Sequence, residues 1–359
     1  GNLGVVFNSL GEYQKAKEYH EKALATATEI GDKQGEGDIN SNLGAVFYSL
    51  GKYQKAKEYY EEALAIAIEI GDRIGEGTIN GNLGTVFHSL SEYQKAKEYL
   101  EKALAIAIET GDKRGEGNIN GNLGAMFRSL GEYQKAKEYH KKALAIAIEI
   151  GDRIGEGSSY SSLGDLYFEL RKNLQAKEHL DKAVGVSLAI GDRNLEAQAT
   201  TYLAAVFASV NDHQKAKECC EKALIISGEC GNRKLEAEIY LSLGNLFRLL
   251  GESGKAENYL EKACSISSQL GHKMTEFQSL LSITQLKVSQ SELVKANECL
   301  FQCIGKYEQI RSFLKENSEF EISLLEECGT FPYQLLTDLL CRTGKFRDAL
   351  YAEELGRAR

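Results

Sequence analysis

The chain has 359 residues, of which 43% are hydrophobic, and a formal net charge of −9 at neutral pH. Acidic and basic residues alternate along it and do not gather into basic blocks, which disfavours nucleic acid and acidic membrane surfaces as partners. No stretch approaches the roughly 18 apolar residues needed to cross a membrane, and the first residues lack the layout of a signal peptide. The charge pattern does not exclude polar or basic proteins as partners.

A phrase of 40 residues repeats along almost the whole chain. Copies beginning at residues 1, 41, 81 and 121 open with a small residue followed by Asn-Leu-Gly, and fainter copies begin at residues 161, 201, 241 and 281. A fixed period of this size is typical of a solenoid, in which each unit buries its apolar face only against its neighbours. The repeat therefore predicts a binding surface and leaves the ligand open.

Each repeat is predicted to hold two helices, and the second copy shows the signals. Gly71 supplies a left-handed helix end, and Asp72 directly after it caps the next helix. We therefore expect one helix over residues 33–50 and a second over residues 53–70, with a break at Gly51. The nearly alternating segment over residues 63–70 imitates a strand, but its alanines favour a helix.

Two small residues are predicted to let the paired helices approach closely. Gly44 recurs in most repeats and Ala56 recurs in all of them, while Phe47 fills the volume alongside. A larger residue at either small position is expected to destabilise the pair by roughly 1–3 kcal/mol.

These residues carry a resemblance to the tetratricopeptide repeat family. The matching positions are Leu43, Gly44, Phe47, Gly51, Tyr53, Ala56, Tyr60 and Ala63. The common repeat has 34 residues and ends its second helix with proline, whereas this one is longer and lacks that proline. It is similar to the long variety of animal Pins-type G-protein-signalling modulators and of metazoan tetratricopeptide proteins with a C-terminal CHAT (caspase-like) domain. The resemblance implies an all-α, right-handed superhelical solenoid of antiparallel helix hairpins.

The organisation that we predict has two parts. Residues 1–310 form eight tandem repeats, of which the first is truncated and the eighth is degenerate, with a long last helix running from Lys295 towards Phe313. Residues 311–359 form a C-terminal helical cap that contains a degenerate ninth hairpin over residues 335–343 and 346–355. The last residues, 352–359, are similar to the segment that leads into a CHAT domain, which implies that such a domain follows residue 359.

A row of asparagines is the first candidate for binding. In tetratricopeptide solenoids the first helices line the concave groove, and one position on them carries the same residue in four copies. These residues are Asn2, Asn42, Asn82 and Asn122. An amide donates and accepts hydrogen bonds at once, so the row can hold the backbone of an extended peptide. Bridging of adjacent repeats by the same asparagines is the structural alternative, and the two roles do not exclude each other.

A second position varies between otherwise near-identical copies, which is expected of residues that select the side chains of a peptide; neutral drift on a solvated face is the alternative. The candidates at this position are Tyr48, His88, Arg128, Phe168 and Arg248. Arg128 and Arg248 are best placed to pair with a carboxylate. Flanking positions of the same groove are assigned to Asp38, Thr78, Asn118 and Asp165. The basic clamp of chaperone-binding relatives is missing, so the tails of chaperones are not expected as ligands.

Nothing in the sequence predicts catalysis. The six histidines do not cluster, and neither a P-loop nor a metal-ligand spacing is present. His20 and His140 take the core position of Tyr60, where a packed histidine is expected. Glu36 and its counterparts, each three residues after a basic residue, are interpreted as structural. Cys220 and Cys303 replace core residues and are interpreted as buried reduced thiols, typical of a cytosolic protein.

We therefore predict a non-enzymatic scaffold, without cofactor, metal or small-molecule substrate, that holds an extended segment of a partner protein. The alternative is the sensor arm of a larger CHAT protease whose catalytic domain lies beyond residue 359. The reduced thiols predict a cytoplasmic location, and the resemblance implies cytoskeletal, mitotic or polarity partners.

Overall fold

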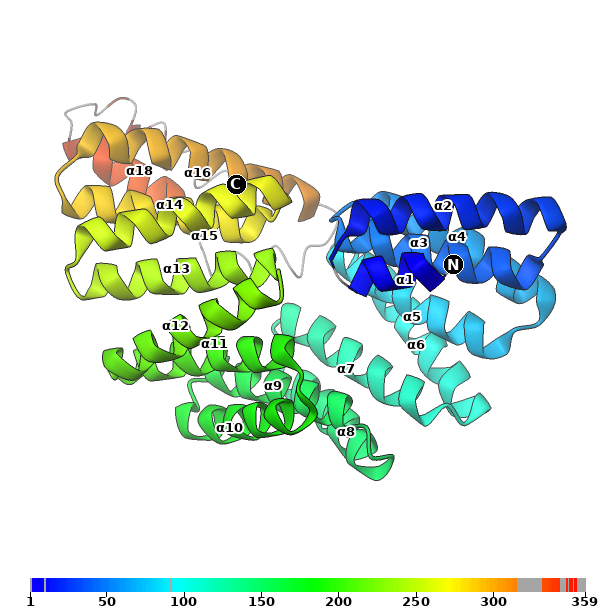
Figure 1. Cartoon of the computed structure of the whole chain (residues 1–359). Coiled ribbons are helices and arrows are strands. Elements are labelled where there is room, and N and C mark those ends of the chain that lie inside the picture. The colour runs from blue at the N-terminus through cyan, green and yellow to red at the C-terminus, as the bar shows by residue number, and fades with distance from the viewer. Residues whose placement is uncertain are drawn as a thin grey trace. The chain divides into compact units, whose positions relative to one another are not determined.

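The computed structural model describes residues 2–9, 11–90, 92–314 and 331–342, together with residues 347, 349–350 and 352–353. All 17 regular elements in these ranges are α-helices (Figure 1). The chain divides into two compact units, Gly1–Ala199 and Thr200–Arg359. The predicted all-α class is confirmed.

The first unit is a series of paired helices. They are α1 (Asn2–Ser9), α2 (Tyr13–Ile30), α3 (Lys33–Ser49), α4 (Tyr53–Ile70), α5 (Arg73–Ser89), α6 (Tyr93–Thr110), α7 (Lys113–Ser129), α8 (Tyr133–Glu149), α9 (Arg153–Glu169) and α10 (Asn173–Ile190). Each packs against the next one along the chain, which is the arrangement of a solenoid of hairpins.

The second unit continues the pattern after α11 (Arg193–Ser209), which spans the division. Its helices are α12 (His213–Glu229), α13 (Arg233–Leu249), α14 (Ser253–Leu270), α15 (Lys273–Ser289), α16 (Leu293–Leu314) and α18 (Phe331–Arg342). Consecutive helices from α12 to α16 pack together, and α18 packs against α16.

The glycine and aspartate signals define the helix ends as predicted. Gly71 ends α4 with φ of 73°, in the left-handed region, and the Asp72 carboxylate accepts a hydrogen bond from the backbone N–H of Gly75 at 2.9 Å. α3 ends one residue before the predicted limit, and α4 has the predicted limits. The alternating segment over residues 63–70 is helical, as its alanines indicated.

Glycine on the first helix of a hairpin makes room for a large residue on the second. A Cβ on Gly84 would lie 2.6 Å from Leu100 Cγ and 3.2 Å from the carbonyl oxygen of Ala96. Gly44 meets Tyr60 in the same way, with 2.8 Å to the ring. The predicted close approach is confirmed, and the large residue that fills the space comes from the middle of the second helix.

Contacts between aromatic rings and lysines join the helices of a hairpin and link neighbouring hairpins. Phe47 stacks on Tyr59 with ring centroids 5.1 Å apart, and the Lys55 ammonium lies 5.6 Å from the centroid of Phe47. Lys57 reaches the following repeat, 5.7 Å from the ring centroid of Phe87. Each such cation–π contact at an exposed site contributes about 0.5–1 kcal/mol.

The recurring glutamates are structural, as interpreted from the sequence. Arg73 binds Glu76 at 2.6 Å within the first turn of α5, and its other nitrogen binds Glu109 of α6 at 2.7 Å. The same pairing within the first turn is made by Lys33–Glu36, Lys113–Glu116, Arg153–Glu156, Arg193–Glu196 and Arg233–Glu236. These ion pairs stabilise the first turns of the helices, and the glutamate carboxylates are occupied by them.

The degenerate eighth repeat still folds as a hairpin. Thr284 and Lys287, at the positions of glycine and phenylalanine in earlier copies, are buried, and Lys287 forms an ion pair with Glu257. α16 has 22 residues, which confirms the long last helix. α18 covers part of the predicted ninth hairpin, but half of residues 346–355 lie outside the described residues. The domain limit at residue 310 therefore remains a prediction.

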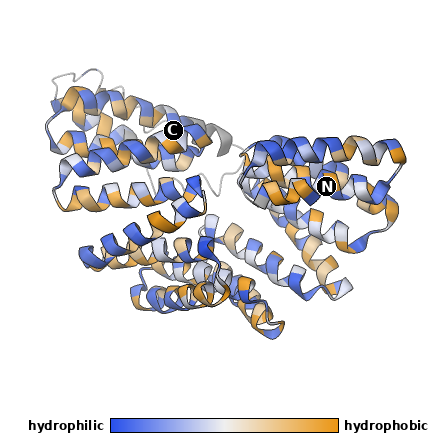
Figure 2. Cartoon of the chain, in the orientation of Figure 1, coloured by the Kyte–Doolittle hydropathy of each residue, from blue (hydrophilic) through white to orange (hydrophobic). Residues whose placement is uncertain are grey.

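Hydrophilic and hydrophobic residues interleave along the helices (Figure 2). No helix within the described ranges combines the length and the apolarity that a membrane span requires.

The close approach of the helices can be tested at Gly84. We expect Gly84→Ala to lower the free energy of unfolding by about 1–3 kcal/mol, because the added methyl group meets Leu100 and the backbone of Ala96. The control is Gly185→Ala in α10, where a Cβ would have no neighbour within 4 Å and better helix propensity should stabilise by roughly 0.5–1 kcal/mol. Urea unfolding followed by circular dichroism measures both; equal effects would contradict the packing account.

Candidate functional site

Three clefts follow one another along the first unit, each between the two helices of one repeat and the first helix of the next. The first cleft (α3, α4, α5) has a volume of about 280 Å³, the middle cleft (α5, α6, α7) about 110 Å³ and the third cleft (α7, α8, α9) about 740 Å³. Neighbouring clefts share lining residues: Ile74 and Thr78, then Asn82, Asn118 and Asn122. Together they form a continuous surface, which we call the groove.

The floor of the groove is apolar because isoleucines from each second helix line it. The lining includes Ile66, Ile106 and Ile146 in successive clefts. Glycine stands opposite on the first helix: a Cβ on Gly77 would lie 2.8 Å from Ile106 Cγ2. The isoleucine occupies the space that a side chain at Gly77 would need, so this glycine lets Ile106 pack against the backbone of α5.

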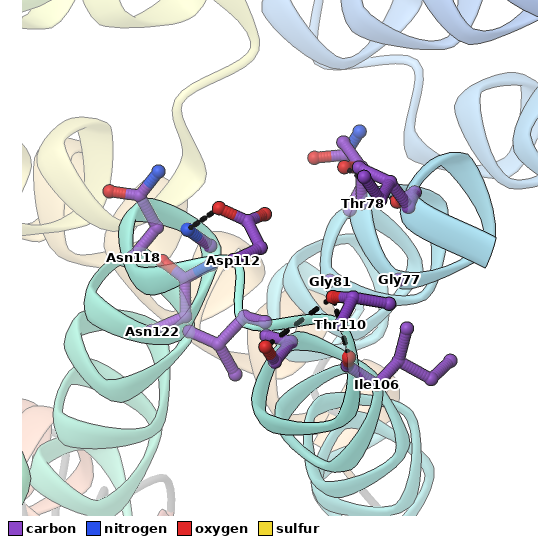
Figure 3. Close-up of a pocket in the computed structure, with 13 residues that line it drawn as sticks. Gly77, Thr78, Gly81, Ile106, Thr110, Asp112, Asn118 and Asn122 are labelled. Carbon is purple, nitrogen blue, oxygen red and sulfur yellow. Dashed lines mark hydrogen bonds between the residues drawn. The ribbon is translucent and has the colours of Figure 1, made fainter.

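Polar groups line the walls, and they differ in whether they are already engaged. In the middle cleft Asn118 and Asn122 of α7 face Thr78 of α5 (Figure 3). Thr110 Oγ1 donates to the carbonyl oxygen of Ile106 at 2.8 Å, so its hydroxyl proton is used within α6. Within the part of the chain that is described, the amides of Asn82 and Asn118 form no hydrogen bond and are available to a ligand.

Of the four asparagines in the predicted row, two line the groove and two do not. Asn82 and Asn122 line the middle and third clefts, whereas Asn42 and Asn2 line none of the three. Asn122 Nδ2 donates to Thr85 Oγ1 of the preceding repeat at 3.3 Å, which is the bridging role for this one residue. Of the flanking candidates, Asp38 and Thr78 line the first cleft, and Asp165 lines none of the three.

The variable position lies against the following repeat. The hydroxyl of Tyr48 and that of Ser89 lie 2.9 Å apart, and His88 Nε2 lies 2.9 Å from the Ser129 hydroxyl. The imidazole of His88 is enclosed between these helices, and burial lowers its pKa to about 4, with the nearby Arg128 contributing. Neither residue lines a cleft, and Phe168 is half-buried outside them.

Two charged candidates bind one another. Arg128 forms an ion pair with the buried Asp165 of the next repeat, and its Nε lies 3.8 Å from Glu169. Arg248 lies in the second unit, on α13, where its buried Nε has no hydrogen-bond partner among the described residues and burial lowers its pKa.

The third cleft is larger because α9 carries smaller residues than its counterparts, a feature that the sequence analysis did not use. Ser159 stands where α7 has Ile119. A Cβ on Gly81 would touch Ile119 Cγ1 at 3.7 Å, whereas a Cβ on Gly121, one repeat later, would have no neighbour within 4 Å. The signal in the sequence is the loss of an isoleucine that the three preceding copies share.

The third cleft reaches His140 of α8. Its side chain is only 3% exposed, and it forms no hydrogen bond within the described residues. Burial lowers the pKa of His140 to about 4, with a further contribution from Arg128. The packed position predicted for His20 and His140 is confirmed, but only His140 borders a cleft.

Cysteine and metal chemistry find little support in the structure. Cys220 and Cys303 are buried and reduced, as interpreted from the sequence, and burial raises the pKa of Cys220 to about 12. A thiol with so high a pKa is a poor nucleophile. Over the described residues no group of three or more potential ligands is placed to hold a metal ion.

The depressed pKa of His140 predicts how stability depends on pH. An unfolded histidine takes up its proton near pH 6.5, but native His140 does so only near pH 4. Its contribution is therefore complete above pH 6.5 and is lost as the pH falls towards 4, by up to about 3 kcal/mol. His140→Leu, which copies Leu100 of the preceding repeat, should reduce this loss in urea unfolding at pH 7 and pH 5. An unchanged loss would contradict the assignment.

Comparisons with known proteins agree with this architecture. The sequence profile described as tetratricopeptide repeat matches residues 1–69, 35–109, 115–189 and 195–269. No curated protein matches the sequence. The Rap conjugation gene regulator of plasmid pLS20, solved in complex with the Phr* peptide, is 14% identical, with 79% of this chain and 77% of that protein covered and a TM-score of 0.66.

Two further solved structures are similar. The apo form of the quorum sensor NprR from B. thuringiensis is 14% identical, with coverage of 84% of this chain and 87% of its own, and a TM-score of 0.65. A STAND signal-transduction ATPase with a tetratricopeptide repeat sensor from Pyrococcus horikoshii is 16% identical, with 98% of this chain and 52% of that protein covered and a TM-score of 0.59. At these identities the likeness is one of fold. Since the family profile covers most of its length, the chain belongs to the tetratricopeptide repeat family.

Proposed function

We propose that this chain is a non-enzymatic scaffold that binds an extended peptide segment of a partner protein in the groove of its first unit. The observation that carries the proposal is the continuity of the three clefts, which share their lining residues and span four repeats. A continuous trough fits an extended chain better than it fits a compact small molecule.

Asparagine amides hold the backbone of the peptide in this proposal. Asn82 and Asn118 face the groove with their amides unengaged, and each can donate to a peptide carbonyl and accept from a peptide N–H. Asn122 borders the same space and retains acceptor capacity while it donates to Thr85. Gly121, where an added Cβ would have no described neighbour within 4 Å, lacks a side chain that would keep a backbone at a distance.

The clefts themselves select the side chains. Tyr48 and His88 were the sequence-based candidates for this task, yet their polar atoms bind serines of the following repeat. We assign to them, and to the Arg128–Asp165 pair, the task of fixing the spacing between repeats. Direct peptide contacts by Asn2, Asn42, Phe168 and Arg248 remain predictions.

Similar proteins support binding of a peptide. The pLS20 regulator was solved with a peptide bound, and its fold matches this chain over most of both lengths. Cytoskeletal partners, a cytoplasmic location and kinship to Pins-type or CHAT proteins remain hypotheses from the sequence.

A sensor role in a larger protein is the second candidate. The Pyrococcus horikoshii protein carries its tetratricopeptide repeats as a sensor in a signal-transduction ATPase, and this chain covers 52% of it. By analogy, the groove would be the sensor of a multidomain protein such as a CHAT protease. Reading the coding sequence past residue 359 separates the two candidates: a caspase-like domain favours the sensor, and a stop codon or GoLoco-type motifs favour the scaffold.

Selection from a displayed peptide library tests the proposal. The wild-type chain is compared with Gly121→Leu, which fills the third cleft from a position with no neighbour within 4 Å, and with Asn82→Ala/Asn118→Ala. The matched control is Gly185→Leu, which adds the same side chain to an exposed position of α10 outside the groove. Circular dichroism confirms that each variant folds.

We expect a common motif to be enriched on the wild type and on Gly185→Leu and to be lost on the two groove variants. Equal enrichment on all four proteins would place the site elsewhere. No enrichment on the wild type would contradict a peptide-binding role for this chain.

A further inference from the structure

The third cleft differs from the other two in ways that point to a particular side chain. We infer that it is the anchor site of the groove and that it takes a tyrosine side chain, whose ring fills the cleft and whose hydroxyl bonds His140. The source of this tyrosine rests on the proposed function, since it belongs to the bound peptide.

Size separates the third cleft from its neighbours. Its volume of about 740 Å³ lies within the range of roughly 300–1,000 Å³ that is usual for binding pockets, whereas the first and middle clefts, at about 280 and 110 Å³, fall below it. The cause is the serine side chains of α9. Ser159 leaves empty the space that Ile119 fills in the middle cleft, so the third cleft has the most room for a ring of the three.

The floor of the third cleft is apolar. Ala143, Ile146 and Ala147 of α8 line it together with Ala125 of α7. An aromatic ring buries about 150–250 Å² of surface, so such a floor favours it over a short polar side chain such as serine.

His140 supplies one buried polar group at this floor. It is 97% shielded, forms no hydrogen bond within the described residues, and borders the cleft. Since no described residue bonds the imidazole, a ligand group that reaches it through the cleft can supply a hydrogen bond. A phenol hydroxyl both donates and accepts, so it satisfies the neutral imidazole in either tautomer. A phenylalanine ring would leave the imidazole unsatisfied.

The charge of the third cleft favours a neutral ligand group. Its two charged residues, Arg114 and Asp152, bind each other, with Arg114 Nε and Nη2 3.2 and 3.3 Å from the two carboxylate oxygens. The two charges offset each other, so the pair favours neither a carboxylate nor an ammonium group of the ligand. Neutrality, an apolar floor and one polar group in the depth of the cleft together describe a phenol.

Nuclear magnetic resonance on the full chain tests this inference without any peptide partner. The probes are N-acetyl-tyrosinamide and N-acetyl-phenylalaninamide, titrated to their solubility limits into protein with isotope-labelled histidine. We expect the tyrosine amide to shift the ring signals of His140 with a dissociation constant in the millimolar range, and to bind roughly fivefold more tightly than the phenylalanine amide.

Two variants and a control locate the site. Ser159→Ile copies Ile119 and should abolish binding of both amides, because it closes the cleft. His140→Leu copies Leu100 and should bring the tyrosine amide down to the affinity of the phenylalanine amide, a loss of about fivefold. His20→Leu changes the equivalent histidine of the first repeat, which borders none of the clefts, and should alter neither titration.

The inference is overturned if the two amides bind equally, if neither shifts His140, or if Ser159→Ile binds as the wild type does. These outcomes are independent of the peptide-library selection. If that selection fails but the tyrosine amide shifts the His140 signals, the proposal of an extended peptide ligand is rejected and the phenol site is retained. If the selection gives a motif but neither amide shifts His140, the groove is retained as the peptide-binding surface and the tyrosine anchor site is rejected.

Discussion

Stacking of the repeats depends on how closely the two helices of each hairpin approach. Glycine at Gly84 and its counterparts allows a large residue such as Leu100 to lie directly on the facing backbone, at a distance that leaves no room for a methyl group. This contact fixes the distance between the helix axes. Because this distance is the same in each hairpin, every following hairpin packs against a surface of the same shape. Contacts such as that of Tyr48 with Ser89 can therefore recur every 40 residues.

Small residues therefore serve two purposes in this chain, and the neighbouring side chain decides which. Against Gly84 the space is filled by Leu100, so the glycine is part of the core. At Gly121 no atom fills it, so the glycine is part of the groove wall. The change from isoleucine to Ser159 in the fifth repeat replaces a packed side chain by a cavity, and the buried His140 borders that cavity. A solenoid of nearly identical copies can thus gain a distinct site through a few truncated side chains.

The helices could be predicted almost residue by residue, because a glycine in the left-handed region and an aspartate cap mark the start of most first helices. The groove could be predicted only in part. Asn82, Asn118 and Asn122 do line it. Tyr48 and His88, however, which were predicted to face a peptide, bind Ser89 and Ser129 of the following repeat. The side of a helix that contacts the next repeat depends on how successive hairpins are oriented relative to one another. The sequence of a single repeat does not specify this orientation.

Isoleucine methyl groups provide the most direct test of the groove as the binding surface. Ile66, Ile106 and Ile146 line the three clefts, while the residues two positions later, Ile68, Ile108 and Ile148, are 59%, 60% and 54% exposed and line none of them. Methyl resonances of the labelled chain would be recorded during titration with a pool of synthetic peptides. The groove predicts shifts at the first three methyl groups and unchanged signals from the other three. Shifts confined to the exposed isoleucines, or no shifts at all, would contradict it.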